Sequence, residues 1–212
     1  MFVVIFEVQP KTQRWHEYLE TAKLLRPELE RIDGFIDNER FKSRRTEGRV
    51  LSLSTWRDEK ALVRWRTQAT HHTQGQQPGR FEIFADYHLR VGEVTADTAA
   101  AGGETPMGQR FDVTETGAAT VVTLTEVGPE VGDDSSARLR LADLPGLVDQ
   151  EWFDSLTQEG KRVLLASWTD AGAARGYVPV LDDGIRLRQV RVIRDYGMRD
   201  RREAPQYFPD VV

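Results

Sequence analysis

One segment of this chain occurs twice, and this repeat constrains the fold more than any other feature of the sequence. Residues 41–61 share eight identities with the residues 112 positions further along, without a gap. The identical pairs are Phe41/Phe153, Ser43/Ser155, Glu47/Glu159, Gly48/Gly160, Leu53/Leu165, Trp56/Trp168, Asp58/Asp170 and Ala61/Ala173. Solenoid repeats have periods of about 20–50 residues, whereas a unit of roughly 100 residues is the usual size of a domain. The repeat therefore predicts a duplicated domain.

Composition excludes several classes of protein. The net charge of −5 gives no general attraction to nucleic acid or to an anionic membrane surface. The absence of cysteine excludes disulfides, thiolate metal sites and a cysteine nucleophile. The N-terminal apolar run is six residues long, too short for a signal peptide or for a membrane span of ~20 residues. We expect a soluble cytoplasmic protein whose partners are neither nucleic acids nor membranes.

The first half shows an alternation of strand and helix patterns. The predicted elements are a strand over 2–8, a helix with apolar residues at three- and four-residue spacing over 15–32, strands over 35–43 and 50–56, a helix capped by Asp58, a polar loop over 71–79 and a last strand over 81–94. Pro27 predicts a kink or break in the first helix. This order is the ferredoxin-like βαββαβ pattern.

The second half repeats this pattern in reduced form. Residues 96–118 are small, polar and glycine-rich and are predicted to link a domain over 1–95 to a degenerate domain over 119–212. The first helix of the second domain is expected to shrink to a segment near Leu139–Val148. The first half should therefore hold the roomier cavity, while the second half supplies a sheet.

A sheet with both helices on one face leaves its other face apolar and uncovered, so this face must be buried against something. The duplication offers the second sheet as that partner. The fold expected is α+β, with two ferredoxin-like domains packed sheet to sheet inside one chain.

Several motifs resemble the antibiotic biosynthesis monooxygenase (ABM) family. They are residues 2–8, Gly34-Phe35, residues 49–56 and the series Trp65-Arg66, His71, Gln74, Gly79-Arg80, Phe84-Ala85-Asp86-Tyr87 and Leu89-Arg90-Val91. The resemblance covers residues 1–94 and extends to the second half only through the repeat. It implies a dimeric α+β barrel, here formed within one chain, and leaves association of two chains into a homodimer open.

The resemblance also implies a class of chemistry. The family includes cofactor-free oxygenases that act with O2 on small aromatic phenols or quinol-like molecules, as well as haem-degrading enzymes. Trp56 matches the position of a tryptophan implicated in the oxygenases, but the asparagine four residues before it is Ser52 here. In the haem-degrading branch an asparagine occupies roughly the place of Phe6, and His71 and His72 are displaced from the axial histidine. Haem is therefore disfavoured, and no cofactor is expected.

The residues themselves suggest a site and also plainer alternatives. Cofactor-free oxygenation needs a dry apolar pocket, a base and hydrogen-bond donors for a developing oxyanion. His71 or His72 is the candidate base, or else a helix C-terminal histidine held by the helix dipole. The candidate catalytic residues are His71, His72, Trp56 and Ser52, and the candidate substrate-binding residues are Trp65, Tyr87, Phe6 and Trp15. The aromatic residues could equally be core.

The remaining motifs argue against other activities. An adjacent histidine pair lacks the i, i+4 spacing of metal ligands on a helix, so no metal site is expected. The arginine-rich segment 186–202 resembles a nucleic-acid patch, but an alternating edge strand explains it as well. No phosphate-binding or dinucleotide-binding glycine motif occurs. The alternatives to a monooxygenase are a non-catalytic ligand-binding or stress-related barrel and a haem-binding or haem-degrading protein.

Overall fold

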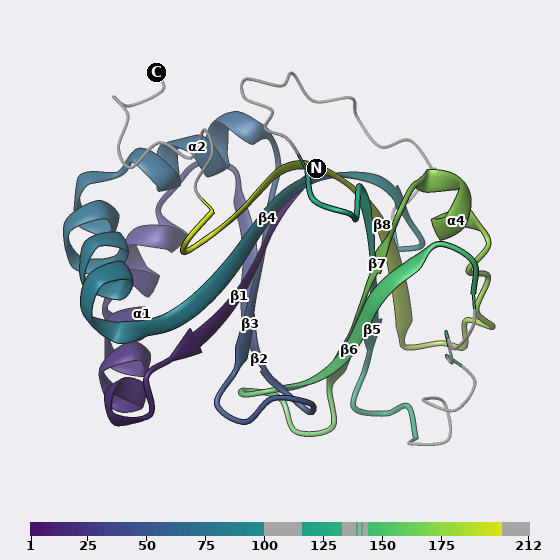
Figure 1. Cartoon of the computed structure of the whole chain (residues 1–212), viewed down its shortest axis with the longest axis horizontal. Coiled ribbons are helices and arrows are strands. Elements are labelled where there is room, and N and C mark those ends of the chain that lie inside the picture. Colours follow the sequence, from purple (N-terminus) through teal and green to yellow (C-terminus); the bar gives the residue numbers. More distant parts are fainter. Residues whose placement is uncertain (100–115, 133–138, 140, 142–143, 201–212) are drawn as a thin grey trace.

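The computed structural model describes residues 1–99, 116–132, 139, 141 and 144–200, and its eight strands form one closed antiparallel barrel. The strand order around the barrel is β1-β3-β2-β6-β7-β5-β8-β4 (Figure 1). The first half contributes β1 (Phe2–Pro10), β2 (Phe35–Ser43), β3 (Val50–Trp56) and β4 (Phe84–Asp97), and the second half contributes β5 (Val121–Val127), β6 (Leu147–Ser155), β7 (Arg162–Trp168) and β8 (Ile185–Gly197). The predicted fold class, two ferredoxin-like sheets joined within one chain, is confirmed.

Two edge pairings close the barrel. β2 pairs with β6 through three residues on each strand, so that Phe41 lies opposite Ser155 and Ser43 lies opposite Phe153. The sequence repeat thus pairs with itself across the seam between the halves. β4 pairs with β8 over a longer stretch, from His88 opposite Gly197 to Asp97 opposite Arg188. A closed barrel has no free edge, so each half completes the hydrogen bonding of the other.

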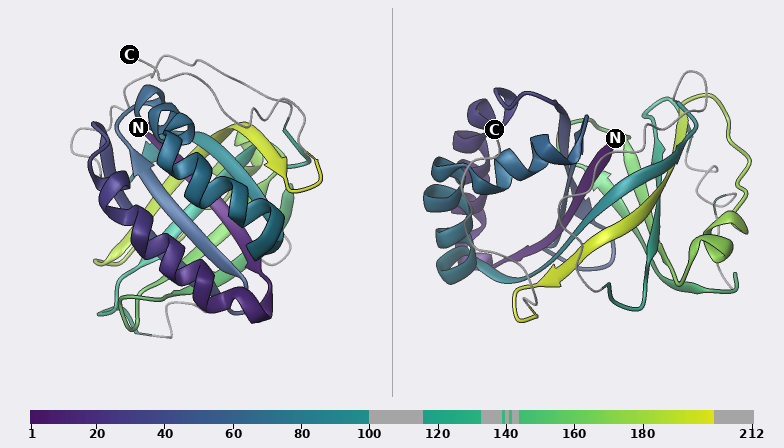
Figure 2. Two further views of the ribbon diagram at one scale, coloured as in Figure 1. Left: turned by 90° about the vertical axis from the view of Figure 1, so that its left-hand side faces the viewer. Right: turned by 90° about the horizontal axis from the view of Figure 1, so that it is seen from above.

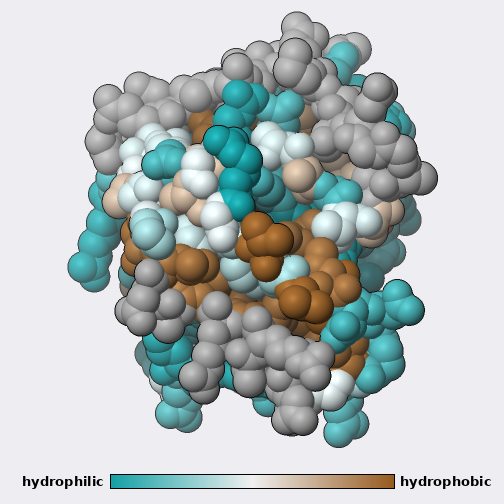
Figure 3. Space-filling view, turned by 90° about the vertical axis from the view of Figure 1, so that its right-hand side faces the viewer, coloured by the Kyte–Doolittle hydropathy of each residue, from teal (hydrophilic) through white to brown (hydrophobic). Residues whose placement is uncertain are grey.

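The helices lie almost entirely on one side of the molecule (Figures 1 and 2). The short turn η1 (Thr12–Arg14), the long helix α1 (Trp15–Glu30), α2 (Glu59–Thr67) and the π-helical turns η2 (His71–Gln76) and η3 (Gly79–Ile83) all belong to the first half. In the described part of the second half the only helix is α4 (Ala171–Arg175). Apolar side chains gather on the outer face of this half (Figure 3), and Val148, Val178 and Val180 are exposed.

Side-chain alternation divides the buried residues between two layers. Val3, Ile5, Leu51 and Leu53 point into the barrel, where they pack with apolar residues of the second half such as Phe153. The alternate residues of the same strands, which include Val4 and Phe6, face the helices. Because helices cover one face of the sheet and the barrel interior lies against the other, β3 is buried along nearly its whole length.

The repeat is reproduced in local geometry. The carboxylates of Asp58 and Asp170 accept hydrogen bonds from the backbone N–H groups of Ala61 and Ala173, as expected for helix N-caps. Gly34 and Gly146, also 112 positions apart, have φ angles of 92° and 79°, a region that favours glycine.

Several predicted boundaries are wrong. Residues 69–83 form a continuous helical segment instead of a polar loop, and the last strand of the first half spans Phe84–Asp97 instead of 81–94. Pro27 lies inside α1 and does not end it. The short helix expected near Leu139–Val148 is absent from the described residues there, since β6 begins at Leu147. Ala96 and Asp97, the first two residues of the predicted linker 96–118, belong to β4. Residues 100–115 of this linker lie outside the described part.

The arginine-rich segment is not an edge strand, because β8 pairs with β4 on one side and β5 on the other. Arg186, Arg188, Arg191 and Arg194 form ion pairs with Asp97, Glu126, Glu93 and Glu59 respectively. Ile193 has no partner in the β4 register, because Val91 pairs with Arg194 and Gly92 with Val192. This bulge reverses the alternation, so Val190 and Val192 point into the barrel whereas Tyr196, which unbroken alternation would put on the same face, lines the cavity on the other side.

Candidate active site

A cavity of about 240 Å³ lies in the first half, between the sheet and the helices. Its floor is the helix-facing side of β1, β3, β2 and β4, and its roof is α1, α2 and the helical segment 69–83. The walls are mostly apolar, and they include Val4, Leu25, Leu62 and Leu89. The volume lies below the ~300–1,000 Å³ usual for drug-sized ligands, so the cavity suits a small molecule.

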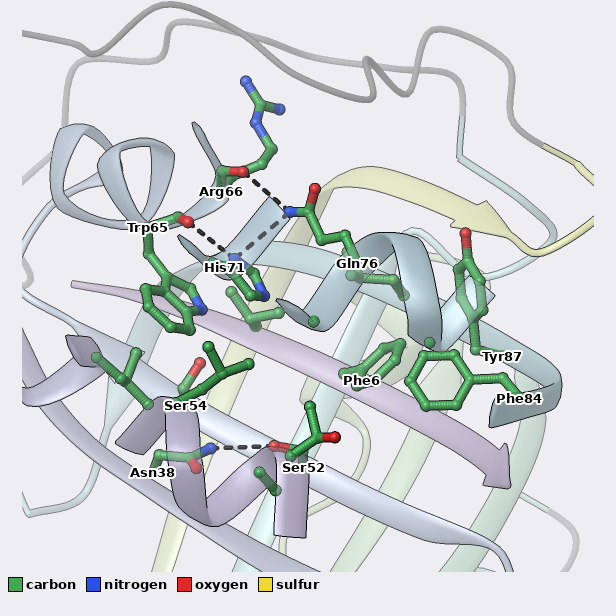
Figure 4. Close-up of a pocket in the computed structure, with 18 of the residues that line it drawn as sticks. Phe6, Asn38, Ser52, Ser54, Trp65, Arg66, His71, Gln76, Phe84 and Tyr87 are labelled. Carbon is green, nitrogen blue, oxygen red and sulfur yellow. Dashed lines mark hydrogen bonds between the residues drawn. The ribbon is translucent and has the colours of Figure 1, made fainter. Parts of the chain in front are cut away.

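His71 lies flat against Trp65 in the cavity wall, with ring centroids 4.0 Å apart and an interplanar angle of 10°. Its Nδ1 lies 2.8 Å from the backbone carbonyl oxygen of Trp65, and because a carbonyl can only accept, Nδ1 carries the hydrogen. Nε2 therefore holds a free lone pair, and it points away from this bond (Figure 4). Burial lowers the pKa of His71 to about 4, against the opposing effect of the carbonyl hydrogen bond, so the ring is neutral near pH 7.

A strip of polar side chains crosses the cavity floor on β2 and β3. Asn38 pairs in register with Ser54, and Arg40 pairs with Ser52, so these four side chains share the helix-facing side of the sheet. The side-chain amide of Asn38 donates to Ser52 Oγ at 3.0 Å and to the Leu53 carbonyl at 3.1 Å (Figure 4). An asparagine amide thus lies beside Ser52, on the neighbouring strand.

Aromatic residues enclose one end of the cavity. Phe6, Phe84 and Tyr87 lie close together, with ring centroids 5.8 Å apart for Phe6 and Phe84 and 5.6 Å apart for Phe6 and Tyr87 (Figure 4). Such tilted and edge-to-face arrangements are the favoured geometries of aromatic pairs. This end presents a rigid apolar surface.

The second half contributes to the cavity although its described part carries little helix of its own. Arg194 and Tyr196 of β8 line the same space. The Arg194 guanidinium lies 2.6 Å from a carboxylate oxygen of Glu59 on α2, and both side chains are at most 1% exposed. The fused chain therefore builds one cavity from both halves.

Five of the eight candidate residues predicted from the sequence line the cavity: His71, Ser52, Trp65, Tyr87 and Phe6. Three do not. Trp56 is fully buried in the helix–sheet core, where its indole N–H donates to Ser54 Oγ at 2.9 Å. His72 lies outside the lining, with Nδ1 3.0 Å from Gln76 Oε1, and Trp15 packs against Tyr18 at the edge of the core.

Four polar cavity residues were not predicted from the sequence, namely Asn38, Arg40, Gln76 and Arg194. The alternation of β2 could have indicated Asn38 and Arg40, because both lie on the side opposite Phe41, which points into the barrel. Predicting Gln76 as a cavity residue requires knowing that residues 71–79 are helical. Predicting Arg194 requires knowing that β8 has a bulge at Ile193.

The described residues contain no group of three or more histidine, aspartate or glutamate side chains that could hold a metal ion. Of the four histidines only His71 lines the cavity, and its Nδ1 is already bonded to a carbonyl. A haem macrocycle exceeds the size of the small ligands that a cavity of about 240 Å³ accommodates. The residues present therefore fit haem poorly. None of the helices in the described part of the chain is long and apolar enough to cross a membrane.

Comparison with known proteins identifies the family. The family model described as antibiotic biosynthesis monooxygenase matches residues 1–77. A protein of the fungus Pyricularia oryzae named Jasmonate monooxygenase ABM is 44% identical over 218 residues, which cover 99% of each chain. The chain belongs to the antibiotic biosynthesis monooxygenase family.

Solved structures show lower similarity. An anthrone oxidase-like protein is 16% identical, with 96% of each chain covered and a TM-score of 0.34. A monooxygenase-like protein of Listeria innocua is 9% identical, with 91% of this chain and 94% of the other covered and a TM-score of 0.28.

Proposed function

We propose that the chain is a monooxygenase that uses O2 to oxidise a small, largely apolar organic molecule in the first-half cavity. The family membership and the monooxygenase name of the 44% identical relative support this activity. The observation that carries the proposal is the neutral His71, which lies in an apolar cavity with its Nε2 lone pair unused by the Trp65 carbonyl.

His71 can orient an acidic substrate. A neutral imidazole accepts a hydrogen bond from a substrate O–H group or takes up its proton. Because the pKa of His71 is lowered to about 4, its conjugate acid is unfavourable, and proton transfer is practical only from a phenol or enol whose anion is itself stabilised. Stacking on Trp65 fixes the plane of the ring and thus the direction of Nε2.

Ser52 can stabilise the oxygen that becomes negative. Its Oγ accepts a hydrogen bond from Asn38, which leaves the hydroxyl hydrogen of Ser52 to be donated to a substrate oxygen. Asn38 Nδ2 is fixed by its second bond to Leu53, so the hydroxyl is held in place before substrate binds. Asn38 and Ser52 together would supply a fixed hydrogen-bond donor for the substrate oxygen, as a single asparagine at position 52 would.

The balance of electrons favours activated substrates for a reaction without cofactor. When a CH2 group flanked by aromatic rings becomes a carbonyl, both hydrogens leave as water with one oxygen atom of O2, and the other oxygen atom forms the C=O bond. The substrate then supplies all four electrons. Hydroxylation of an unactivated C–H bond needs two further electrons from a reductant, such as a reduced nicotinamide. We therefore propose an aromatic or quinol-like substrate for the cofactor-free reaction, and jasmonate, named in the relative, as the substrate to test with a reductant.

O2 consumption by metal-stripped protein tests the proposal. The panel contains an anthrone, a naphthohydroquinone and jasmonic acid, each with and without reduced nicotinamide, and products are identified by mass spectrometry. We expect uptake with at least one molecule and a loss of 10-fold or more in His71→Asn. His72→Asn is the matched control, because its side chain lies outside the cavity and its activity should be retained.

The other outcomes are informative. Thermal stabilisation by these molecules without any O2 uptake would contradict the proposal and favour a non-catalytic ligand-binding barrel. A Soret band on titration with haemin would favour a haem protein. Equal activity in the His71 and His72 variants would remove the role of His71 and leave the oxygenase activity standing.

A further inference from the structure

The charge of the cavity lining is opposite to that of the whole chain. The chain has 34 acidic and 29 basic residues, yet the described residues that line the cavity include five arginines and no aspartate or glutamate. A lining of one sign inside low-dielectric walls concentrates ligands of the opposite sign. The cavity is therefore electrostatically suited to an anion.

Arg40 differs from the other four arginines of this set in having neither an ion pair nor a stacked ring among the described residues. Arg26 pairs with Glu30, Arg194 pairs with Glu59, Arg80 lies over the ring of Phe81 at 5.7 Å from its centroid, and Arg66 also has an interaction partner. Arg40 has no carboxylate within ion-pair distance among the described residues, and its Nε is buried without a hydrogen-bond partner there. Arg40 as a whole is only partly buried, but a buried donor atom without an acceptor is costly, so the free cavity is left with an unsatisfied donor.

Tyr18 provides a second unsatisfied donor beside Arg40. Tyr18 of α1 is 6% exposed and lines the cavity, and its hydroxyl lies beside the Arg40 guanidinium, which can only donate to it, so that the hydroxyl hydrogen has no acceptor among the described residues. Burial raises the pKa of Tyr18, while the nearby guanidinium of Arg40 partly offsets this rise. The phenol therefore keeps its hydrogen at neutral pH and can donate it.

These two donors match one chemical group. A carboxylate has two oxygens, which can accept from the Arg40 guanidinium and the Tyr18 hydroxyl at once, and arginine–carboxylate bonds are among the stronger hydrogen bonds in proteins. A neutral ester or ketone can accept hydrogen bonds from the same groups, but it leaves the charge of Arg40 uncompensated and forms weaker bonds. We propose that Arg40 and Tyr18 bind the carboxylate of the substrate, so that the enzyme selects small apolar acids over their neutral esters. This inference rests on the proposed function for the statement that the bound acid is oxidised.

Four molecules test the subsite by calorimetric titration, namely jasmonic acid, 1,4-dihydroxy-2-naphthoic acid and the methyl ester of each. We expect the wild-type protein to bind at least one acid 10-fold or more tighter than its ester. Arg40→Met should reduce acid affinity at least 10-fold and leave ester affinity within 2-fold, and Tyr18→Phe should do the same to a smaller extent. Arg14→Gln, which removes an exposed charge outside the cavity, is the control and should retain the preference for acid.

A stability measurement separates binding from folding. Because Arg40 has no carboxylate partner in the described part of the chain, Arg40→Met should keep or raise the melting temperature without ligand while it abolishes the stabilisation by acid. A large fall in melting temperature would show that Arg40 has a structural role and would overturn the proposal. Equal affinity for acid and ester, or no binding by any of the four molecules, would also overturn it.

Turnover distinguishes this proposal from the monooxygenase activity. Binding of acids that depends on Arg40, without O2 uptake from either acid, would keep the carboxylate subsite and contradict the proposed function. O2 uptake with acid and ester alike, unchanged in Arg40→Met, would keep the proposed function and remove the subsite.

Discussion

Arg194 of the last strand and Glu59 at the start of α2 form an ion pair at 2.6 Å in which neither side chain is more than 1% exposed. The pair joins the second half of the chain to a helix that roofs the cavity of the first half. A buried charge that loses its partner is strongly destabilising, because it stays desolvated without compensation.

Removing one member of this pair should therefore be more harmful than removing both. We expect Glu59→Gln or Arg194→Met to lower the free energy of unfolding by about 3–5 kcal/mol. The double variant Glu59→Leu/Arg194→Met should lose less than either single change, because no unpaired buried charge remains. Urea unfolding followed by circular dichroism measures all of these values, and additive losses would contradict a direct pairing.

Trp56 should affect stability and not substrate affinity. It is fully buried, lies outside the cavity lining and packs edge-on against Phe35 at 5.5 Å between centroids. Trp56→Phe should lower the free energy of unfolding by about 1–3 kcal/mol, because it leaves a void and an unpaired Ser54. The matched variant is Trp168→Phe, because the indole N–H of Trp168 donates to Thr123 Oγ1 in the second half in the same way.

The two variants should destabilise to a similar degree, and both should leave the affinity for ligand unchanged. A rise of 10-fold or more in the dissociation constant for Trp56→Phe alone would restore Trp56 as a substrate-binding residue. Calorimetric titration of a bound ligand, beside thermal unfolding, makes the comparison.

Gly34 and Gly146 should tolerate alanine equally poorly. At Gly34 an added Cβ would lie 2.7 Å from the Cβ of Ala61, and at Gly146 it would lie 2.5 Å from the Cβ of Ala173. Since φ is positive at both positions, each alanine variant should lose about 1–3 kcal/mol of unfolding free energy. Gly132→Ala, where an added Cβ meets nothing within 4 Å, is the control and should lie within about 0.5 kcal/mol of wild type.

The two partly buried histidines His71 and His88 should give opposite pH dependences of stability. Burial lowers the pKa of His71 to about 4, whereas its unfolded value is near 6.5. Between these values the unfolded chain binds a proton that the folded chain does not, so the contribution of His71 is full above pH 6.5 and decreases as pH falls toward 4. Unfolding by urea between pH 4.5 and 7 should show this slope in wild type and a smaller one in His71→Gln.

His88 should act in the other direction. Burial alone would lower its pKa, but hydrogen bonds to Asp195 and Glu7 outweigh this effect and raise it. The folded state then holds a proton that the unfolded state has lost, so His88 stabilises fully below pH 6.5 and this contribution disappears as pH rises through the folded pKa. His88→Gln should reduce stability more at pH 6 than at pH 9, and an equal loss at both values would contradict the assignment.

The fold could be predicted from the sequence because its strongest signals are local and repeated. Helix caps such as Asp58 and Asp170, the glycines at the turns and the alternation of β1 and β3 each fix an element without reference to distant residues. The helical segment 69–83 was missed because its sequence, rich in glycine, glutamine and threonine, has no apolar period. Its helix is held by packing against α1 and by side-chain bonds such as Gln76 to the Arg66 carbonyl.

The site was only partly predictable, for a different physical reason. The candidates Phe6, Ser52, Trp65, His71 and Tyr87 line the cavity, and their roles stay predictions. Trp56 lies in the core instead, because tryptophan in a strand fits a core as well as a pocket, and burial alone separates the two. Arg194 and Tyr196 line the cavity although they lie more than 100 residues after the other lining residues in the sequence. A bulge in β8 turns them toward the cavity, and no local sequence pattern reveals this bulge.

The unequal distribution of helices between the described parts of the two halves has a consequence for how the protein can evolve. In a symmetric pair of identical chains every substitution appears twice, so a change that improves one site also alters the structural support of the other. Here the sequence that roofs the cavity and the sequence that supplies Arg194 and Tyr196 belong to different halves of one chain. Each half can therefore vary independently, and the specificity of the cavity can be changed from the second half without touching the residues around His71.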